Sequence, residues 1–135
     1  MQQRTILLVE PDSTLRASWR VGLQSMGFTL IETGDAASGL RAALANEVAL
    51  LVTELYLPSD ESRCLVRAAR SEPGLSRLKI LVVTDHATDD DRAWALTSGA
   101  DAYLLKPVRL GRMLQVSARL ATMRGPGRAG ARAAR

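Results

Sequence analysis

The stretch ILLVEPD at residues 6–12 sets four consecutive aliphatic side chains directly before an acidic turn. An uninterrupted aliphatic run predicts a strand that is covered on both faces, as in the parallel sheets of α/β proteins. The run is far shorter than the roughly 20 apolar residues that a membrane-spanning helix needs. We therefore expect a central, buried strand whose carboxyl end carries Glu10 and Asp12.

Similar short apolar runs recur along the chain, and each begins 21 to 31 residues after the one before it. The predicted strands are Thr5–Val9, Phe28–Ile31, Ala49–Thr53, Ile80–Thr84 and Ala102–Leu105. Each interval has room for one helix and two short loops, and its apolar residues follow helical spacing. The predicted helical segments run from Leu15 to Met26, Ala36 to Leu44, Cys64 to Ala69, Asp89 to Thr97 and Leu110 to Ala121. The pattern predicts a three-layer α/β sandwich around a five-stranded parallel sheet.

Length and composition are those of one globular domain followed by a basic tail. The chain has 135 residues, 47% of them hydrophobic, and its single cysteine excludes an internal disulfide or a CxxC motif. Four of its 18 Lys and Arg residues lie in 124–135, where no acid occurs, so the remainder balances the 14 Asp and Glu residues. We expect 124–135 to be a solvated end, because it has no large apolar side chain to bury. The first residues do not resemble a secretory signal, and we expect a soluble cytoplasmic protein.

Polar side chains follow four of the five predicted strands. They are Glu10 and Asp12, then Glu54, then Thr84, and finally Lys106. Because the ligand site of a parallel α/β sheet lies outside the carboxyl ends of its strands, we expect these groups to meet there. No Gly-rich turn follows the first strand, which disfavours a dinucleotide site, and a P-loop is absent. The sequence predicts a cluster of carboxylates with one hydroxyl and one ammonium group.

Four stretches at these strand ends resemble, in order, the receiver domain of bacterial two-component response regulators. They are residues 6–12, LVTELYLP at 51–58, ILVVT at 80–84 and GADAYLLKP at 99–107. The resemblance covers Thr5 to Thr122 and implies the flavodoxin-like (CheY-like) fold with strand order 2-1-3-4-5, usually with a cis bond before Pro107. It divides the chain into a receiver domain at 1–123 and a basic, disordered tail at 124–135.

The resemblance also implies a role for each polar residue. In the family, an acidic pair and an acceptor Asp hold Mg²⁺, which favours oxygen ligands, and the acceptor takes a phosphoryl group. A Ser or Thr then binds a phosphoryl oxygen, and a Lys offsets the negative charge. Thr84 and Lys106 match these two positions, and Tyr103 matches the aromatic switch position on the strand 102–105.

The acidic part of the motif departs from the family pattern. Glu54 stands at the acceptor position, Pro11 replaces the second member of the acidic pair, and Asp85 stands where the family usually has a small residue. Glu10, Asp12 and Glu54 remain as candidate metal ligands. Asp12, however, immediately precedes Ser13 and Thr14 at the start of a predicted helix, where an N-cap acid is expected. We expect weak Mg²⁺ binding or none, and no other cofactor.

Glu54 has two possible roles in such a site. Its carboxylate reaches roughly 1.5 Å further than that of an Asp, toward Thr84 and Lys106. It carries a single negative charge, whereas a phosphoryl group brings about −1.5 to −2, so Glu54 is a partial mimic of phosphorylated Asp. A Glu54–Lys106 pair either holds an active-like surface or merely satisfies a buried ammonium, and the sequence leaves both readings open.

Three functions follow from this reading. The leading hypothesis is a stand-alone, atypical receiver (a pseudo-receiver), not an enzyme, that binds other signalling proteins independently of phosphorylation through the face formed by 89–97, 102–105 and 110–121. The alternative is a response regulator that accepts phosphate from a histidine kinase at Glu54 with weakened Mg²⁺ dependence. The third is a weak nucleic-acid contact by the arginines of 124–135, which the absence of aromatics there disfavours. A second copy of the chain is a candidate partner, and we expect no membrane contact.

Overall fold

The computed structural model describes residues 4–58, 64–123, 125 and 127. The strands are β1 (Thr5–Val9), β2 (Thr29–Thr33), β3 (Leu50–Thr53), β4 (Lys79–Thr84) and β5 (Ala102–Leu105). The helices are α1 (Ser13–Ser25), α2 (Ala36–Ala45), α3 (Cys64–Arg70), α4 (Asp89–Ser98) and α5 (Leu110–Thr122), with a short 3₁₀ helix η1 (Pro73–Leu75) before β4. No helix in these ranges is long and apolar enough to cross a membrane.

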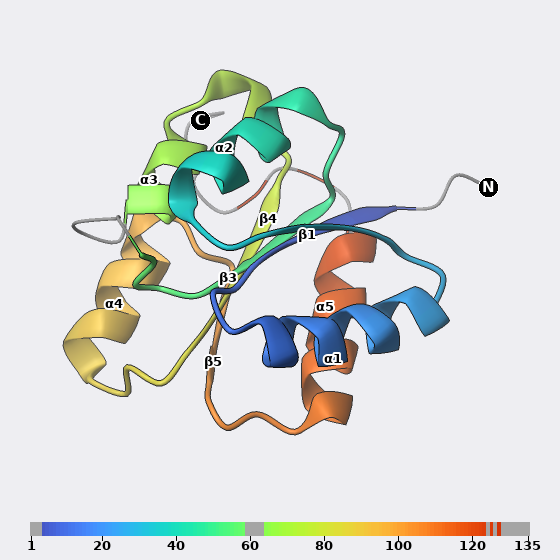
Figure 1. Cartoon of the computed structure of the whole chain (residues 1–135). Helices are drawn as coiled ribbons and strands as arrows, with labels where there is room; N and C mark the ends of the chain where they lie inside the picture. Colours follow the sequence, from blue (N-terminus) through green and yellow to red (C-terminus); the bar gives the residue numbers. More distant parts are fainter. Residues whose placement is uncertain (1–3, 59–63, 124, 126, 128–135) are drawn as a thin grey trace.

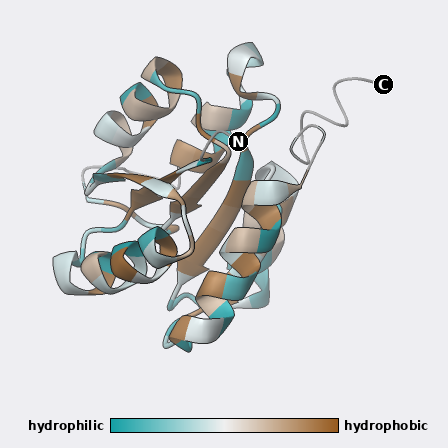
Figure 2. Cartoon of the chain, turned by 90° about the vertical axis from the view of Figure 1, so that its right-hand side faces the viewer, coloured by the Kyte–Doolittle hydropathy of each residue, from teal (hydrophilic) through white to brown (hydrophobic). Residues whose placement is uncertain are grey.

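Within the described residues, the strands form one parallel sheet in the order β2-β1-β3-β4-β5, which confirms the predicted fold. Helices α1 and α5 cover one face of the sheet, and α2, α3 and α4 cover the other (Figure 1). The fully buried side chains of β1 divide between the two cores: Leu7 and Val9 face α2–α4, and Ile6 and Leu8 face α1 and α5. Both faces of β1 are therefore apolar, and Figure 2 shows such apolar strands running between the helices.

Local sequence signals set the start of three helices. Asp12, Asp35 and Thr88 are the N-caps of α1, α2 and α4, and each side chain accepts a hydrogen bond from a backbone N–H of the first turn. Helix α4 stops at Gly99, whose φ of 121° favours glycine, and a Cβ there would collide with the Arg70 side chain. These caps fix where each helix leaves the sheet and so where each strand-end loop lies.

The edge strand β2 differs most from the sequence-based bounds. The apolar pattern predicts 28–31, whereas β2 extends to Glu32 and Thr33, which pair with Leu8 and Val9 of β1. The side chains of β2 at the edge of the sheet are at most half-buried, so polar residues are tolerated there and the apolar run ends before the strand does. The other four strands agree with their predicted bounds within one residue.

Arg70, the last residue of α3, contacts the sheet at the amino ends of β4 and β5. Its guanidinium donates to the carbonyl oxygens of Gly99 at 2.9 Å and Leu78 at 2.5 Å, and pairs with Asp101 at 2.8 Å. The same oxygen of Asp101 accepts the Ile80 N–H at 2.8 Å. One buried cation thus meets one carboxylate and two main-chain acceptors, and joins α3 to the starts of both strands. We call these groups the Arg70 cluster.

Two residues of the predicted tail lie against the same end of the sheet. Lys79 Nζ donates to the carbonyl oxygen of Gly125 at 2.7 Å, and the Gly127 N–H donates to that of Ser76 at 2.7 Å. Gly127 is buried. The other residues of 124–135 lie outside the described ranges, so the predicted domain boundary after residue 123 and the disorder of the tail stay predictions.

Candidate functional site

Three strand ends bring the candidate residues together at the carboxyl edge of the sheet. Glu10 follows β1, Glu54 follows β3, and Lys106 follows β5. The register pairs Val9 with Thr53, and the Glu54 N–H donates to the Val9 carbonyl oxygen at 3.1 Å. Glu10 and Glu54 are therefore set on neighbouring strands, as the topology rule for parallel sheets predicts.

The two glutamates share the ammonium group of Lys106. The Nζ atom lies 2.7 Å from Glu10 Oε1 and 3.0 Å from Glu54 Oε1. The side chains of Glu10, Glu54 and Lys106 are 3%, 10% and 20% exposed, so both ion pairs are largely shielded from water. We call these three residues the Lys106 cluster. It joins two negative charges to one positive charge.

The second oxygen of each glutamate faces its own loop. Glu10 Oε2 accepts the N–H of Asp12 at 2.9 Å. Glu54 Oε2 accepts the N–H of Leu55 at 2.5 Å, and the N–H of Tyr56 lies 3.4 Å from the same oxygen. Both carboxylates therefore have partners on both oxygens, which is what buried acidic groups require.

Burial and the two acids shift the pKa of Lys106 in opposite directions. Burial alone lowers the pKa of a lysine, because it penalises the charged form. The hydrogen bonds that Lys106 donates to Glu10 and Glu54, with the attraction of their charges, outweigh burial, and the pKa of Lys106 is raised above its usual value. The lysine is therefore held in its charged form at neutral pH.

The geometry does not fit the magnesium site that the family implies. Asp12 is exposed and caps α1, accepting the N–H groups of Thr14 and Leu15 at 3.0 and 3.1 Å. Glu10 and Glu54 are bridged by Lys106 instead of opening toward a shared ion. Among the described residues, no group of three or more His, Cys, Asp or Glu residues could hold a metal ion.

Thr84 and Tyr103 meet at the loop after β4 instead of at Glu54. The fully buried Thr84 hydroxyl accepts the N–H of His86 at 3.3 Å, and the half-buried Tyr103 hydroxyl donates to the His86 carbonyl oxygen at 2.5 Å. Among the described residues, Thr84 forms no side-chain hydrogen bond with Glu54 or Lys106. The expected reach of Glu54 toward both groups is thus met for Lys106 alone. The bond before Pro107 is cis, as the resemblance implies.

Sequence reasoning missed the role of Tyr56 and His86. The Tyr56 hydroxyl donates to Asp91 Oδ1 at 2.6 Å, and the ring of His86 packs edge-on against that of Tyr56 with centroids 4.1 Å apart. A single histidine in a loop is expected to be solvated, and Tyr56 belongs to no periodic apolar pattern. The one available signal was its place two residues after Glu54. Asp85, singled out in the sequence, has a side chain that is 75% exposed.

A parallel sheet in this order, with two acids and a lysine at its carboxyl edge, defines the class of receiver domains. The chain belongs to the response regulator receiver domain family of two-component systems, whose model matches residues 6–118. It is 36% identical over 124 residues to the response regulator protein PmrA of Pseudomonas aeruginosa, covering 92% of this chain and 55% of that protein. It is 31% identical to the transcriptional regulatory protein PrrA of Mycobacterium tuberculosis, covering 81% and 46%. The chain spans about half the length of these relatives.

Solved structures share the same fold. A CheY-like response regulator receiver domain protein from Methanospirillum hungatei superposes with a TM-score of 0.77 at 27% identity, covering 88% of this chain and 94% of that one. The receiver domain of a sensor histidine kinase from Pseudomonas aeruginosa, crystallised with a magnesium ion in its active-site cleft, gives 0.78 at 23% identity, with 90% of this chain and all of that one covered. The second likeness concerns the fold alone.

Proposed function

We propose that this receiver domain is a protein-interaction module whose output does not depend on phosphorylation, with Glu54 partly standing in for a phosphorylated Asp. The 3.0 Å contact between Lys106 Nζ and Glu54 Oε1 carries the proposal, because the lysine that reads a phosphoryl group in the family is already engaged. The mimicry is partial. Glu54 supplies one negative charge instead of about two, and its oxygens reach Lys106 but not the Thr84 hydroxyl.

The contacts of the remaining acidic side chains also support the proposal. Phosphoryl transfer to a carboxylate needs a metal ion or an equivalent charge to neutralise the incoming group. Here Pro11 offers no side-chain ligand, Asp12 caps a helix, and Lys106 binds both remaining acids. Transfer to Glu54 would displace either the Lys106 ammonium from Oε1 or the main-chain donors from Oε2, depending on which oxygen attacks.

Exposed apolar side chains on β5 and α5 support a partner surface formed by α4, β5 and α5. Leu105 and Leu110 are 47% and 43% exposed there, although most large apolar residues of the chain are buried. Tyr103 lies on the same strand as Leu105 and is half-buried. We propose that other signalling proteins bind this face, with a histidine kinase or a second copy of the chain as further candidates.

Phosphorylation of the chain tests the proposal directly. The protein is incubated with acetyl phosphate and Mg²⁺ and its intact mass is measured, with Glu54→Ala as the control. We expect no labile gain of one phosphate. The matched variant combines Glu54→Asp with Pro11→Asp, which restores the acids that the family has at both positions, and its gain of a labile phosphate would validate the assay. A labile phosphate on the parent chain that is lost in Glu54→Ala would overturn the proposal in favour of a phosphate-accepting response regulator.

A further inference from the structure

The loop that carries Glu54 is bound to its own acceptor side chain. Glu54 Oε2 accepts the N–H of Leu55 at 2.5 Å and faces that of Tyr56 at 3.4 Å. The carboxylate therefore orders the backbone from 54 to 56 and with it the direction in which the Tyr56 side chain leaves the sheet. Removing the carboxylate would release the N–H groups of Leu55, a buried residue, and of Tyr56, a half-buried one.

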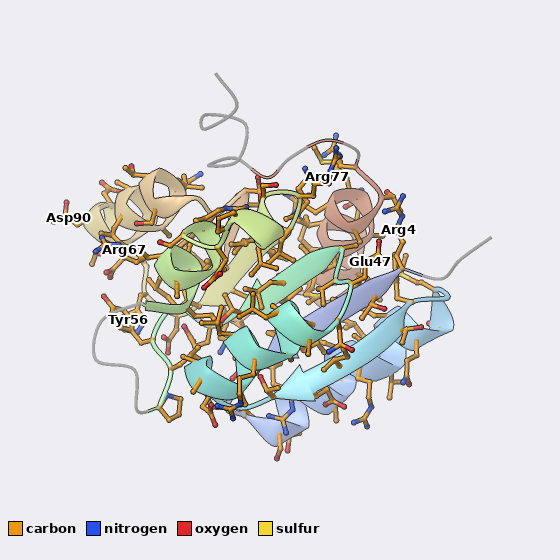
Figure 3. The ribbon with its side chains drawn as sticks, turned by 90° about the horizontal axis from the view of Figure 1, so that it is seen from above. Arg4, Glu47, Tyr56, Arg67, Arg77 and Asp90 are labelled. Atoms are coloured by element: carbon orange, nitrogen blue, oxygen red, sulfur yellow. The ribbon has the colours of Figure 1, made fainter. Side chains whose placement is uncertain are left out.

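Tyr56 in turn holds the start of α4. Its hydroxyl donates to Asp91 Oδ1 at 2.6 Å, across 35 positions in the sequence. Asp91 Oδ2 accepts the hydroxyl of the N-cap Thr88 at 2.8 Å, and the Asp91 N–H donates back to the Thr88 oxygen at 3.1 Å. The tyrosine thus bonds a residue of the reciprocal cap that begins the helix. Figure 3 shows Tyr56 near Arg67 of α3 and Asp90 of α4, at the end of the molecule away from Arg4 and Glu47.

His86 connects the same tyrosine to the two switch residues. Its ring lies edge-on to that of Tyr56 at 4.1 Å, its N–H donates to Thr84 Oγ1 at 3.3 Å, and its carbonyl oxygen accepts the Tyr103 hydroxyl at 2.5 Å. Tyr56 and His86 thus connect Glu54 to the switch residues by a route separate from Lys106, whose own N–H donates to the Thr84 carbonyl oxygen at 2.8 Å.

We propose that Tyr56 is a positioning residue that couples the Glu54 carboxylate to helix α4, and that His86 extends the coupling to Thr84 and Tyr103. The conformation of the Glu54 loop then sets how firmly the first turn of α4 is held. This inference goes beyond the proposed function, because it requires neither a partner protein nor the absence of phosphate transfer. It predicts that a change at Glu54 is felt at α4 only while the Tyr56 hydroxyl is present.

Amide hydrogen exchange of the full chain tests the coupling. Exchange of the α4 peptide 89–98 is compared in the parent, Glu54→Ala, Tyr56→Phe and the double variant. Loss of a hydrogen bond to a charged group predicts roughly tenfold faster exchange of α4 in Tyr56→Phe. We expect roughly threefold in Glu54→Ala, where the loop loosens but the tyrosine hydroxyl remains. The double variant should exchange no faster than Tyr56→Phe alone, because the connection is already broken.

The N-cap of α2 provides a matched control. Asp35→Ala removes a capping carboxylate that accepts the Ser38 N–H at 2.9 Å, and it should speed the exchange of α2. Adding Glu54→Ala to this variant should leave the exchange of α2 unchanged.

Two outcomes would overturn the proposal. In the first, the effects of Glu54→Ala and Tyr56→Phe on α4 multiply in the double variant, which means that Tyr56 only supports the helix. In the second, the exchange of α4 is unchanged in Glu54→Ala. Should Glu54→Ala not fold, Glu54→Gln takes its place with the same criteria. None of these exchange measurements depends on the outcome of the phosphorylation experiment.

Discussion

Arg70 and Lys106 lie at opposite ends of the sheet, the first buried and the second partly exposed, and their charges meet different partners. The guanidinium of Arg70 meets one carboxylate, Asp101, and the carbonyl oxygens of Leu78 and Gly99. The ammonium of Lys106 meets two carboxylates and no carbonyl oxygen among the described residues. One cation and one acid therefore balance within the Arg70 cluster, beside the further cation of Lys79, whereas the Lys106 cluster keeps an excess negative charge.

The difference separates a structural contact from a candidate functional site. Burial is the largest influence on Arg70 and lowers its pKa, even though Asp101 acts against it. Burial also disfavours the charged form of Lys106, but two acids outweigh it and the pKa of Lys106 is raised. Two acids around one cation leave a net negative charge at the carboxyl edge of the sheet, which interacts with a further ion more strongly than a balanced ion pair does.

The largest expected effect is at the Arg70 cluster. Arg70→Ala leaves the Asp101 carboxylate and two carbonyl oxygens buried without this donor, and we expect a loss of about 3–5 kcal/mol in the free energy of unfolding. Urea denaturation followed by far-UV circular dichroism measures it. Arg67→Ala, on the same helix, removes an exposed cation 5.2 Å from the ring centroid of Trp94 and should cost about 1 kcal/mol or less. Equal losses of stability in the two variants would show that the contacts of Arg70 stabilise the fold no more than the exposed Arg67 does.

A smaller effect is expected at the Lys106 cluster. Lys106→Met leaves Glu10 and Glu54 facing each other without a cation, and we expect a loss of about 2 kcal/mol at pH 7, because the lysine is partly exposed. Unfolding free energies of the variant and the parent, measured in urea at pH 7, test this. An unchanged free energy of unfolding in the variant would mean that the two ion pairs of Lys106 do not stabilise the fold.

Alkaline titration of the parent gives a third, weaker signal. The pKa of Lys106 is raised in the folded chain, so the unfolded chain releases this proton first as the pH rises. The stability that the ammonium contributes is complete below the ordinary lysine pKa of about 10.4 and is lost as the pH rises through the raised value. Burial lowers the pKa of Lys79 and acts in the opposite direction, but it is common to parent and variant. The difference in stability between the parent and Lys106→Met should therefore fall above about pH 10.4; a constant difference would contradict it.

The smallest effect concerns two threonines at the ends of β2 and β3. Thr33 Oγ1 is the one buried side-chain oxygen among the described residues that has no hydrogen-bond partner, whereas Thr53 Oγ1 donates to the Glu54 carbonyl oxygen at 2.9 Å. Thr33→Val should leave stability unchanged or raise it by up to about 1 kcal/mol, and Thr53→Val should lower it by about 1 kcal/mol. Thermal melts of both variants distinguish the two. A loss of stability in Thr33→Val would show that its hydroxyl has a partner in solution.

The fold could be predicted because its signals are local and repeated. The aliphatic run before Glu10, the caps at Asp35 and Thr88 and the stop at Gly99 each set one element, and chain topology then fixes which strand ends meet. The same reasoning predicted that Glu54 and Lys106 meet at the carboxyl edge of the sheet. It could not find the bond between Tyr56 and Asp91, because a contact between a loop and the first turn of a helix depends on side-chain directions that no periodicity encodes.

The hydrogens of Lys106 carry one more consequence. A lysine ammonium has three of them, and Glu10 and Glu54 each engage one. Among the described residues, a single N–H therefore remains for an oxyanion from outside the site. Such an anion would bind this one donor first and would then compete with Glu10 and Glu54 for the other two.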